Sequence, residues 1–287
     1  MKIVTDCAAD LSPEDIETMG VCVAPLYIQF TDAEVNSTDL TPDEFYSRME
    51  NMAPEIPTTA QPSSGMFEAL YRPFHEAGES IMSLHISSGL SGTIHSAQVA
   101  ANNLPQADIT LVDTKTLSGG ERFQVIAAAL GAKAGWAKNA ILHQIDQIRL
   151  KTEVIYTLET LEYLERGGRI GRVQALAGSL LKIKPVISVD KTDGKYSNVG
   201  KGRTIDKTIK LIADYLVRQY GVETPMRATV LHGQFIEKAE SMAQILKNNL
   251  NVAKLEIMRI SPVLGVHTGP GVVGVAAVPI SLLDEIR

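Results

Sequence analysis

The stretch SIMSLHISSGLSGTIHSAQVAAN, residues 80–102, decides the fold that we expect. Its first part, Ser80 to Ile86, is short and mostly apolar and predicts a buried strand, and the pattern from about Ser91 to Asn102 predicts a helix. Strand and helix signals alternate in the same way throughout the first half of the chain. The first of them is the strand signal at Lys2 to Thr5, and the last is the helical stretch at Phe123 to Leu150. This alternation predicts an α/β fold with a mainly parallel sheet flanked by helices.

Two further helix starts lie upstream of this stretch. The segments Ser12-Pro13-Glu14-Asp15 and Thr41-Pro42-Asp43-Glu44 each combine an N-cap hydroxyl, a proline at the first helical position and an acidic residue three positions on. Between them, Val21 to Phe30 predicts extended chain, and the proline-rich segment Pro54 to Pro62 predicts a loop.

The second half of the chain adds a hairpin. Val186 to Val189 and Tyr196 to Val199 flank Asp193-Gly194, which is a strong hairpin signal. We therefore expect two α/β domains: residues 1–155 with the mainly parallel sheet, and residues 156–287 with a mixed sheet. No Gly/Ser linker separates them, so a cleft between the domains is the first place to look for a ligand.

Composition excludes several classes of protein. The chain has 287 residues, 45% of them apolar and 21% charged, which is typical of a globular protein with a sizeable core. A net charge of −6 and 5% aromatic residues disfavour nucleic-acid binding. The only two cysteines, Cys7 and Cys22, do not support a disulfide scaffold. Asp6 and Asp10 interrupt any signal-peptide pattern. No run of 18 apolar residues exists that could form a membrane-spanning helix. We expect a cytoplasmic protein without a membrane span.

The charge is unevenly distributed. The segment from Lys151 to Lys210 carries 12 basic and seven acidic residues on an otherwise acidic chain. Such a segment can meet a phosphate or an acidic partner, although solvated helix faces explain it equally well.

Two loops rich in hydroxyl side chains precede predicted helices, at residues 58–65 and 87–93. A junction of strand, loop and helix presents hydroxyls and backbone N–H groups to an anion, aided by the helix dipole. The alternative is that these side chains only cap helices, but the second loop holds four serines and threonines, more than one cap needs. Together the loops would line the carboxyl edge of a parallel sheet, where open α/β folds bind ligands.

Two glycine-rich features near the end of the chain need separate interpretations. The segment Gly269 to Gly274 matches GxGxxG, but no strand–helix–strand unit follows it, so we read a tight turn entering a strand. His267 stands among glycines, where we expect a turn; such a histidine is more often structural, but it could also donate a hydrogen bond to a carboxylate. The six histidines show no metal-ligand spacing, so we expect no metal site.

A serine hydrolase is the alternative that these residues leave open. Gly89-Leu90-Ser91-Gly92-Thr93 nearly matches the nucleophile elbow, with Thr93 in place of the last glycine. Ser91 and His267 would act together, and Asp6 or Asp113, each at the end of a predicted strand, would supply a third member.

A set of short motifs runs along the chain in a fixed order: Thr5-Asp6, Ala9-Asp10-Leu11, Thr58 to Ser63, Ile86 to Thr93, Leu161 to Ile170, Lys182-Ile183-Lys184-Pro185, Lys201-Gly202-Arg203 and His267 to Gly271. This set resembles the DegV family of bacterial fatty-acid-binding proteins, and the resemblance spans about residues 2–284. Departures from the family pattern include Cys7-Ala8 in place of Ser-Thr and a more polar Ser118-Gly119-Gly120-Glu121.

The resemblance implies a function. It implies a long-chain, palmitate-like fatty acid in a tunnel between two α/β domains, with Thr59 and Ser91 bonded to its carboxylate and Ser88 and His267 nearby. It also implies a partner, a fatty-acid kinase related to dihydroxyacetone kinases, which makes the acyl phosphate. The basic residues that we expect to dock this partner are Arg166, Arg169, Arg172, Lys201 and Arg203.

We therefore expect a fatty-acid carrier that needs no other cofactor and is not itself a catalyst. The rivals are the serine hydrolase and a regulator that binds a small molecule or phosphate and no lipid.

Overall fold

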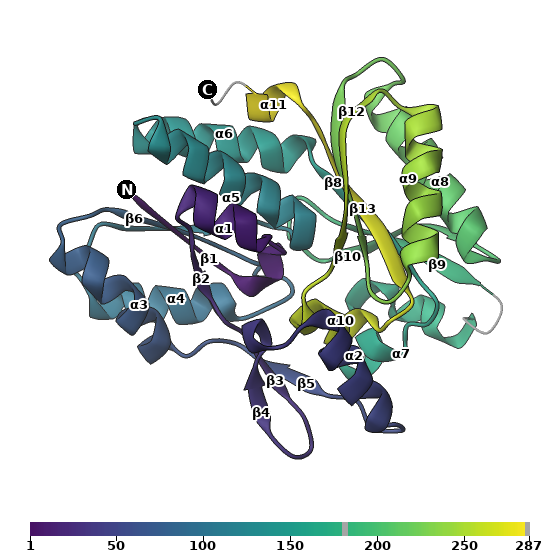
Figure 1. The fold of residues 1–287 in the computed structure, drawn as a ribbon, viewed down its shortest axis with the longest axis horizontal. Helices are drawn as coiled ribbons and strands as arrows, with labels where there is room; N and C mark the ends of the chain where they lie inside the picture. Colours follow the sequence, from purple (N-terminus) through teal and green to yellow (C-terminus); the bar gives the residue numbers. More distant parts are fainter. Residues whose placement is uncertain (180–182, 285–287) are drawn as a thin grey trace.

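The computed structural model describes residues 1–179 and 183–284, and Figure 1 shows two large sheets with helices between and around them. Helices α5 (Ser118–Lys133) and α6 (Lys138–Lys151) lie between the sheets. One helix pair covers the outer face of the first sheet, and another pair covers the outer face of the second. These are α3 (Ser64–Glu76) with α4 (Thr93–Asn103), and α8 (Ile205–Tyr220) with α9 (Ile236–Asn249).

The first sheet is parallel throughout and has the strand order β2-β1-β6-β7, which confirms the expected parallel sheet. Its strands are β1 (Lys2–Asp6), β2 (Cys22–Ala24), β6 (Ile81–His85) and β7 (Ile109–Asp113). Because β1 lies between β2 and β6, the strand order reverses beside β1. This reversal makes a topological switch point at the carboxyl ends of β1 and β6, where open α/β sheets bind ligands.

The second sheet is mixed, as expected, with the order β10-β9-β8-β13-β11-β12. The predicted hairpin is present, since β9 and β10 pair antiparallel and Gly194 in the turn has φ +67°. Strand β13 lies in the middle of the sheet, between β8 and β11. The strands are β8 (Glu153–Leu158), β9 (Lys184–Val189), β10 (Tyr196–Gly202), β11 (Met226–His232), β12 (Val252–Arg259) and β13 (Val272–Pro279).

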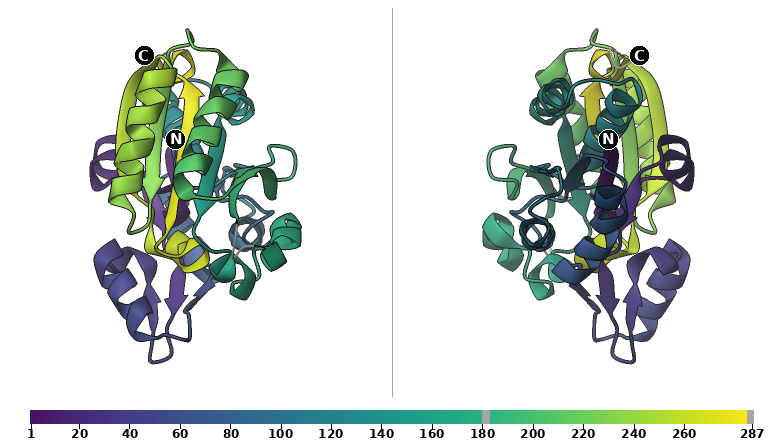
Figure 2. Two further views of the ribbon diagram at one scale, coloured as in Figure 1. Left: turned by 90° about the vertical axis from the view of Figure 1, so that its right-hand side faces the viewer. Right: turned by 90° about the vertical axis from the view of Figure 1, so that its left-hand side faces the viewer.

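A small antiparallel sheet of order β4-β3-β5 projects from one end of the molecule together with α2 (Pro42–Asn51) (Figure 2). It corrects one expectation, because the segment Pro54 to Pro62 is not only a loop. Residues 58–60 pair with β3 and form a strand. The strands are β3 (Tyr27–Gln29), β4 (Glu34–Asn36) and β5 (Thr58–Ala60).

Both predicted capping boxes are present. The side-chain oxygens of Ser12 and Thr41 each accept a hydrogen bond from the backbone N–H of the acidic residue three positions on. The carboxylate of that acidic residue in turn accepts from the backbone N–H of the cap residue. The remaining helices are α1 (Pro13–Met19), α7 (Glu162–Arg166), α10 (Pro262–Thr268) and α11 (Ser281–Asp284), with short 3-10 helices η1 (Cys7–Ala9), η2 (Ser37–Asp39) and η3 (Gly171–Ser179). No helix in the described ranges is long and apolar enough to cross a bilayer.

Helix α5 packs closely on the second sheet because its second and third residues are glycines. A Cβ atom on Gly119 would lie 2.6 Å from the Cβ of Ala276, and one on Gly120 would lie 2.5 Å from a methyl group of Val154. The sheets are therefore joined through α5 by close backbone packing.

The domain boundary that we expected at residue 155 falls inside β8. All of β8 pairs with strands of the second sheet, whereas α6, which ends at Lys151, also packs against the first. We propose Thr152 as the boundary, because it keeps β8 whole.

Candidate functional site

A small cavity lies where the loops after β1 and β6 meet α10, at the switch-point edge of the parallel sheet. Three of its wall residues are predicted site residues, Thr59, Ser91 and His267. The other wall residues are Ala8, Leu26, Ile86, Leu90, Arg169, Tyr196, Val263 and Leu264.

Thr59 and His267 form a hydrogen bond in the wall of this cavity. The distance from Thr59 Oγ1 to His267 Nε2 is 2.9 Å. Thr59 lies in β5 rather than in a loop, and His267 lies in the last turn of α10 rather than in a glycine turn. The turn follows two residues later, at Gly269, whose φ is +72°.

His267 is a neutral imidazole near pH 7. Burial, together with the positive charge of Arg169, lowers the pKa of His267 to about 4. Its Nδ1 atom is buried with no hydrogen-bond partner in the described part of the chain, and it faces Gly167, where a Cβ would lie 2.3 Å away. An unpaired acceptor is tolerated better than an unpaired N–H. We therefore assign the proton to Nε2, which donates to Thr59 and leaves the threonine proton free for a ligand.

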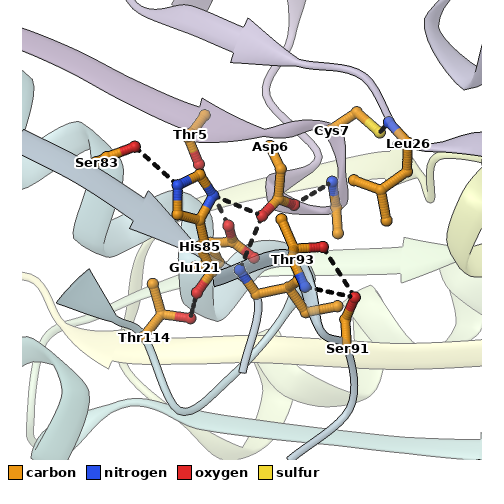
Figure 3. A network of polar contacts seen from close by, with 12 residues as sticks. Thr5, Asp6, Cys7, Leu26, Ser83, His85, Ser91, Thr93, Thr114 and Glu121 are labelled. Carbon is orange, nitrogen blue, oxygen red and sulfur yellow. Dashed lines mark hydrogen bonds and ion pairs between the residues drawn. The ribbon is translucent and has the colours of Figure 1, made fainter. Parts of the chain in front are cut away.

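Ser91 lines the same cavity from the loop after β6. Its Oγ lies 2.8 Å from Thr93 Oγ1 and accepts from the Thr93 N–H at 3.3 Å (Figure 3). The residue at the N-cap position of α4 is Gly92, and no side-chain cap bond is formed there. Ser91 therefore accepts from the N–H of the first helical residue of α4 and lines the cavity at the start of that helix.

Ser88, which we expected near the ligand, lies elsewhere. It is exposed, its N–H donates to Asp113 at 3.1 Å, and its Oγ accepts from Lys115 at 3.2 Å. It does not line the cavity, so we leave it out of the proposed ligand site.

A buried network behind the cavity holds both loops in place. The Asp6 carboxylate accepts from the backbone N–H groups of Ala8 and Ile86 and lies 3.1 Å from His85 Nδ1 (Figure 3). His85 Nε2 in turn lies 2.7 Å from Ser83 Oγ. Because Ala8 and Ile86 are themselves wall residues, Asp6 fixes the two loops of the cavity to each other.

Sequence reasoning did not find this network. The order Ser83, His85, Asp6 is that of a catalytic triad, but all three residues are fully buried, and the His85 ring packs edge-on to Phe67. No substrate reaches Ser83, so the network is structural. The only available signal was the placement of Asp6 and His85 at the ends of two predicted strands.

The arrangement expected for a serine hydrolase is not assembled in the described residues. His267 is bonded to Thr59 rather than to Ser91, and no carboxylate orients its Nδ1. Asp6 is engaged with His85, and Asp113 is engaged with Lys115 and Ser88.

A second small cavity lies between α5, α10 and the second sheet and shares Leu264 with the first. Its lining is mainly aliphatic. The lining residues are Leu117, Ser118, Val154, Ile155, Tyr156, Leu231, Ile260, Leu264, Thr268, Val272, Gly274 and Val275. The two cavities together thus have a polar end at the switch point and an apolar end against the second sheet.

Arg169 differs from the other basic residues that we expected to dock a partner. It is half-buried and lines both the polar cavity and an adjoining hollow that also includes Lys195. Its charge contributes to the lowered pKa of His267. Arg169 is therefore close enough to act on a ligand directly.

The other four basic residues are exposed. Arg166 donates to the carbonyl of Pro54 at 2.6 Å and pairs with Glu162, and Arg172 pairs with Asp190 and Asp193. Lys201 is the next-to-last residue of the hairpin strand β10, and Arg203 lies between β10 and α8. Lys182, part of a matching motif, lies outside the described residues.

Within the described ranges, no group of three or more His, Cys, Asp or Glu side chains is placed to hold a metal ion. The donors around the polar cavity are hydroxyls, an imidazole and a guanidinium, which suit an anion.

Fold and site together define a two-sheet α/β protein with two small neighbouring cavities between its sheets, one with polar groups in its wall and one with a mainly apolar wall. A family model described as "Uncharacterised protein, DegV family" matches residues 1–280, and the chain belongs to this family. A DegV domain-containing protein of Deinococcus radiodurans is 35% identical over 277 residues, covering 96% of this chain and 95% of the relative. The predicted resemblance is therefore confirmed.

Solved structures agree with this assignment. A DegV family protein from Thermus thermophilus, described by its fatty acid binding, aligns with a TM-score of 0.90 and 32% identity, covering 97% of this chain and 99% of the other. DegV from Bacillus subtilis, described as a fatty acid binding protein, gives 0.86 and 28%, with 96% and 98% covered. A stearic acid-binding protein from Eubacterium ventriosum gives 0.86 and 27%, with 97% and 98% covered.

Proposed function

We propose that this protein binds one long-chain, palmitate-like fatty acid, with the carboxylate in the polar cavity and the acyl chain in the apolar one. The observation that carries the proposal is the Thr59–His267 hydrogen bond beside Ser91, at the polar end of a space whose other end is aliphatic. The fatty acids named for the similar Thermus, Bacillus and Eubacterium proteins support this ligand class.

The carboxylate is expected to accept from hydroxyl groups. With the His267 proton on Nε2, the Thr59 hydroxyl proton points to the ligand, and Ser91 supplies a second hydroxyl from the start of α4. An unpaired buried carboxylate is strongly disfavoured, so these donors and the helix dipole are needed. Neutral donors leave the oxygens less tightly held than a bidentate arginine pair would, so one oxygen can still attack a phosphoryl group.

The acyl chain is expected to provide most of the affinity. Burying about fourteen methylene groups at ~0.8 kcal/mol each contributes on the order of 11 kcal/mol before the cost of association is subtracted.

We further propose that the protein presents this carboxylate to a separate fatty-acid kinase, related to dihydroxyacetone kinases, and does not itself catalyse the reaction. The exposed residues Arg166, Arg172, Lys201 and Arg203 belong to a segment with excess positive charge, which suits docking of an acidic surface. Arg169, beside the cavity, suits contact with the phosphoryl group that is transferred. Since such a kinase uses ATP, we place this function in the cytoplasm.

The test is organic extraction of the purified protein followed by mass spectrometry, combined with titration of the delipidated protein with palmitate. We expect a long-chain fatty acid in near-stoichiometric amount and a saturable single site. A lipid-free extract from a protein that also fails to bind added palmitate and oleate would contradict the proposal.

A further inference from the structure

A hollow beside the polar cavity carries positive charge that no acidic residue of its wall balances. Arg169 and Lys195 lie in this wall, which contains no Asp or Glu; the other wall residues are Gly89, Leu90, Gly168, Gly171 and Tyr196. Leu90, Arg169 and Tyr196 also line the polar cavity, so the two spaces adjoin. Gly168 and Lys195 are exposed, so the hollow opens to the protein surface.

The guanidinium group of Arg169 has hydrogen-bond donors to spare at this place. Its Nη1 atom donates to the carbonyl of Gly167 at 2.6 Å, whereas Nε and Nη2 make no hydrogen bond within the described ranges and are open to solvent. Burial raises the pKa of Tyr196 to about 12, and the charge of Arg169 acts against this rise; the same charge, after burial, lowers the pKa of His267. The guanidinium therefore lies near both rings, where the polar cavity and the hollow meet.

Lys195 reaches the hollow from the turn between β9 and β10. Its side chain lies against the loop that carries Ser91, since a Cβ on Gly89 would be 2.8 Å from Lys195 Cγ. In the part of the chain that the structure describes, no carboxylate pairs with its Nζ atom. The neighbouring acid, Asp193, instead pairs with Arg172 and accepts from the Lys195 N–H at 3.1 Å. The ammonium group is therefore available to a ligand.

The charge of the hollow suits a dianion better than a second carboxylate. A fatty-acid carboxylate has a single negative charge, and in the polar cavity it already meets the hydroxyls of Thr59 and Ser91. A phosphate monoester carries about −1.5 to −2 charges near pH 7, and the arginine fork and the lysine point charge are common phosphate ligands. Gly168 and Gly171, with φ of +70° and +43°, place bare backbone in the wall and leave room for phosphate oxygens.

We propose that the hollow binds the phosphate group of a phosphorylated fatty acid, with Arg169 and Lys195 as its two cations. Lys195 then makes the protein hold the phosphorylated acid more tightly than the free acid. The inference rests on the proposed function, because it assumes that the carboxyl end of the lipid lies in the polar cavity. A phosphate joined to that carboxyl group extends past Leu90 and Tyr196 into the hollow.

The experiment compares the dissociation constants of two ligands for the delipidated wild type and for Lys195→Gln, which removes the charge and keeps most of the side chain. One ligand is palmitate, and the other is the β-keto phosphonate analogue of palmitoyl phosphate, in which a methylene group replaces the bridging oxygen and prevents hydrolysis. We expect the wild type to bind the phosphonate about tenfold more tightly than palmitate, and Lys195→Gln to lose this preference. Lys210→Gln is the matched control, because Lys210 is exposed on α8 in the same basic segment and lies outside the hollow, and it should keep the preference.

A second comparison distinguishes a phosphorylated lipid from free phosphate. The phosphonate titration is repeated with inorganic phosphate in place of chloride at constant ionic strength. An unchanged dissociation constant supports a site for phosphate that is joined to the acyl chain. Weaker binding of the phosphonate, with unchanged binding of palmitate, would show that the hollow takes free phosphate and would overturn the assignment to a phosphorylated lipid.

Three further outcomes would overturn the inference: a wild type that binds the phosphonate no more tightly than palmitate, a preference that survives in Lys195→Gln, or an equal loss of preference in Lys210→Gln. In each of these cases palmitate still binds, so the proposed function stands. If neither ligand binds the wild type, the proposed function itself fails. A thermal melt of Lys195→Gln close to that of the wild type shows that a changed preference is not caused by unfolding.

Discussion

The Oγ1 atom of Thr59 lies 2.9 Å from the Nε2 atom of His267, although the two residues are 208 positions apart in the chain. Thr59 belongs to the small sheet that projects from the molecule, and His267 belongs to a helix that packs beneath it. The hydrogen bond therefore joins two parts of the fold at the point where we propose that the ligand carboxylate binds.

Loss of either hydroxyl at this point should weaken fatty-acid binding. We expect Thr59→Val and Ser91→Ala each to reduce the binding free energy of palmitate by roughly 1–3 kcal/mol, the range for a hydrogen bond to a charged group. Calorimetric titration of delipidated protein measures the change. Ser88→Ala is the matched control for the same loop, because Ser88 is exposed and outside the cavity, and it should bind as the wild type does. Wild-type affinity in both site variants would mean that the carboxylate binds elsewhere.

The depressed pKa of His267 predicts a dependence of stability on pH. Its pKa is lowered from 6.5 to about 4, so the unfolded chain takes up a proton between these values while the folded protein does not. Titration of His267 therefore leaves the free energy of unfolding unchanged above pH 6.5. It lowers that free energy as the pH falls from 6.5 towards 4, by roughly 3 kcal/mol at most. Asp10, whose pKa burial raises to about 6, acts in the opposite direction over much of this range.

The effect of His267 is isolated by comparison with His267→Gln. Denaturant unfolding of both proteins at several pH values should show that the wild type loses stability relative to the variant as the pH falls from 6.5 to 4. Curves that run parallel over this range would mean that His267 titrates normally in the folded protein.

The buried carboxylate of Asp6 should matter for stability as well as for binding. Asp6→Ala leaves His85 and the N–H groups of Ala8 and Ile86 without their acceptor, so we expect a loss of about 3–5 kcal/mol in the free energy of unfolding. Asp32→Ala, which removes an exposed pair with Arg48, should cost less than about 1 kcal/mol. Urea denaturation measures both changes, and similar losses in the two variants would contradict the role assigned to Asp6.

Binding of the lipid and docking of the kinase should be separable. We expect Arg203→Ala to keep its affinity for palmitate and to need a higher concentration for half-maximal acyl-phosphate formation with a cognate kinase, because exposed charges act mainly on encounter. The wild-type rate should fall as salt is added. Lys247→Ala, an exposed charge on α9 outside the basic segment, is the control. Loss of lipid binding in Arg203→Ala, with normal kinase kinetics, would place Arg203 at the ligand instead.

Local signals in the sequence predicted much of the fold. The caps at Ser12 and Thr41, the strand at Ser80 to Ile86 and the turn at Gly194 depend on residues close in the chain, and each was confirmed. Strand β5 was missed because its three residues lie among prolines and are held by pairing with β3, about thirty residues away in the sequence.

The site was predictable only in part. Thr59, Ser91 and His267 line one cavity, but the helix that carries His267 was read as a turn because of its glycines. Gly265 lies inside this helix, and a glycine stands there because the rings of Phe45 and Tyr46 leave no space for a side chain, which is a tertiary contact. The Asp6–His85 pair depends in the same way on the pairing of β1 with β6, which a single sequence does not reveal.

The place of β13 has a consequence for how the protein is made. This strand lies between β8 and β11 in the middle of the second sheet, yet it follows both of them in the sequence. A nascent chain can pair the strands of the first sheet once Asp113 has left the ribosome, whereas β8 and β11 lack their shared neighbour until synthesis has passed Pro279. Until then β8 and β11 each expose an unpaired edge, so the growing chain is most exposed to aggregation, and most dependent on chaperones, in this interval.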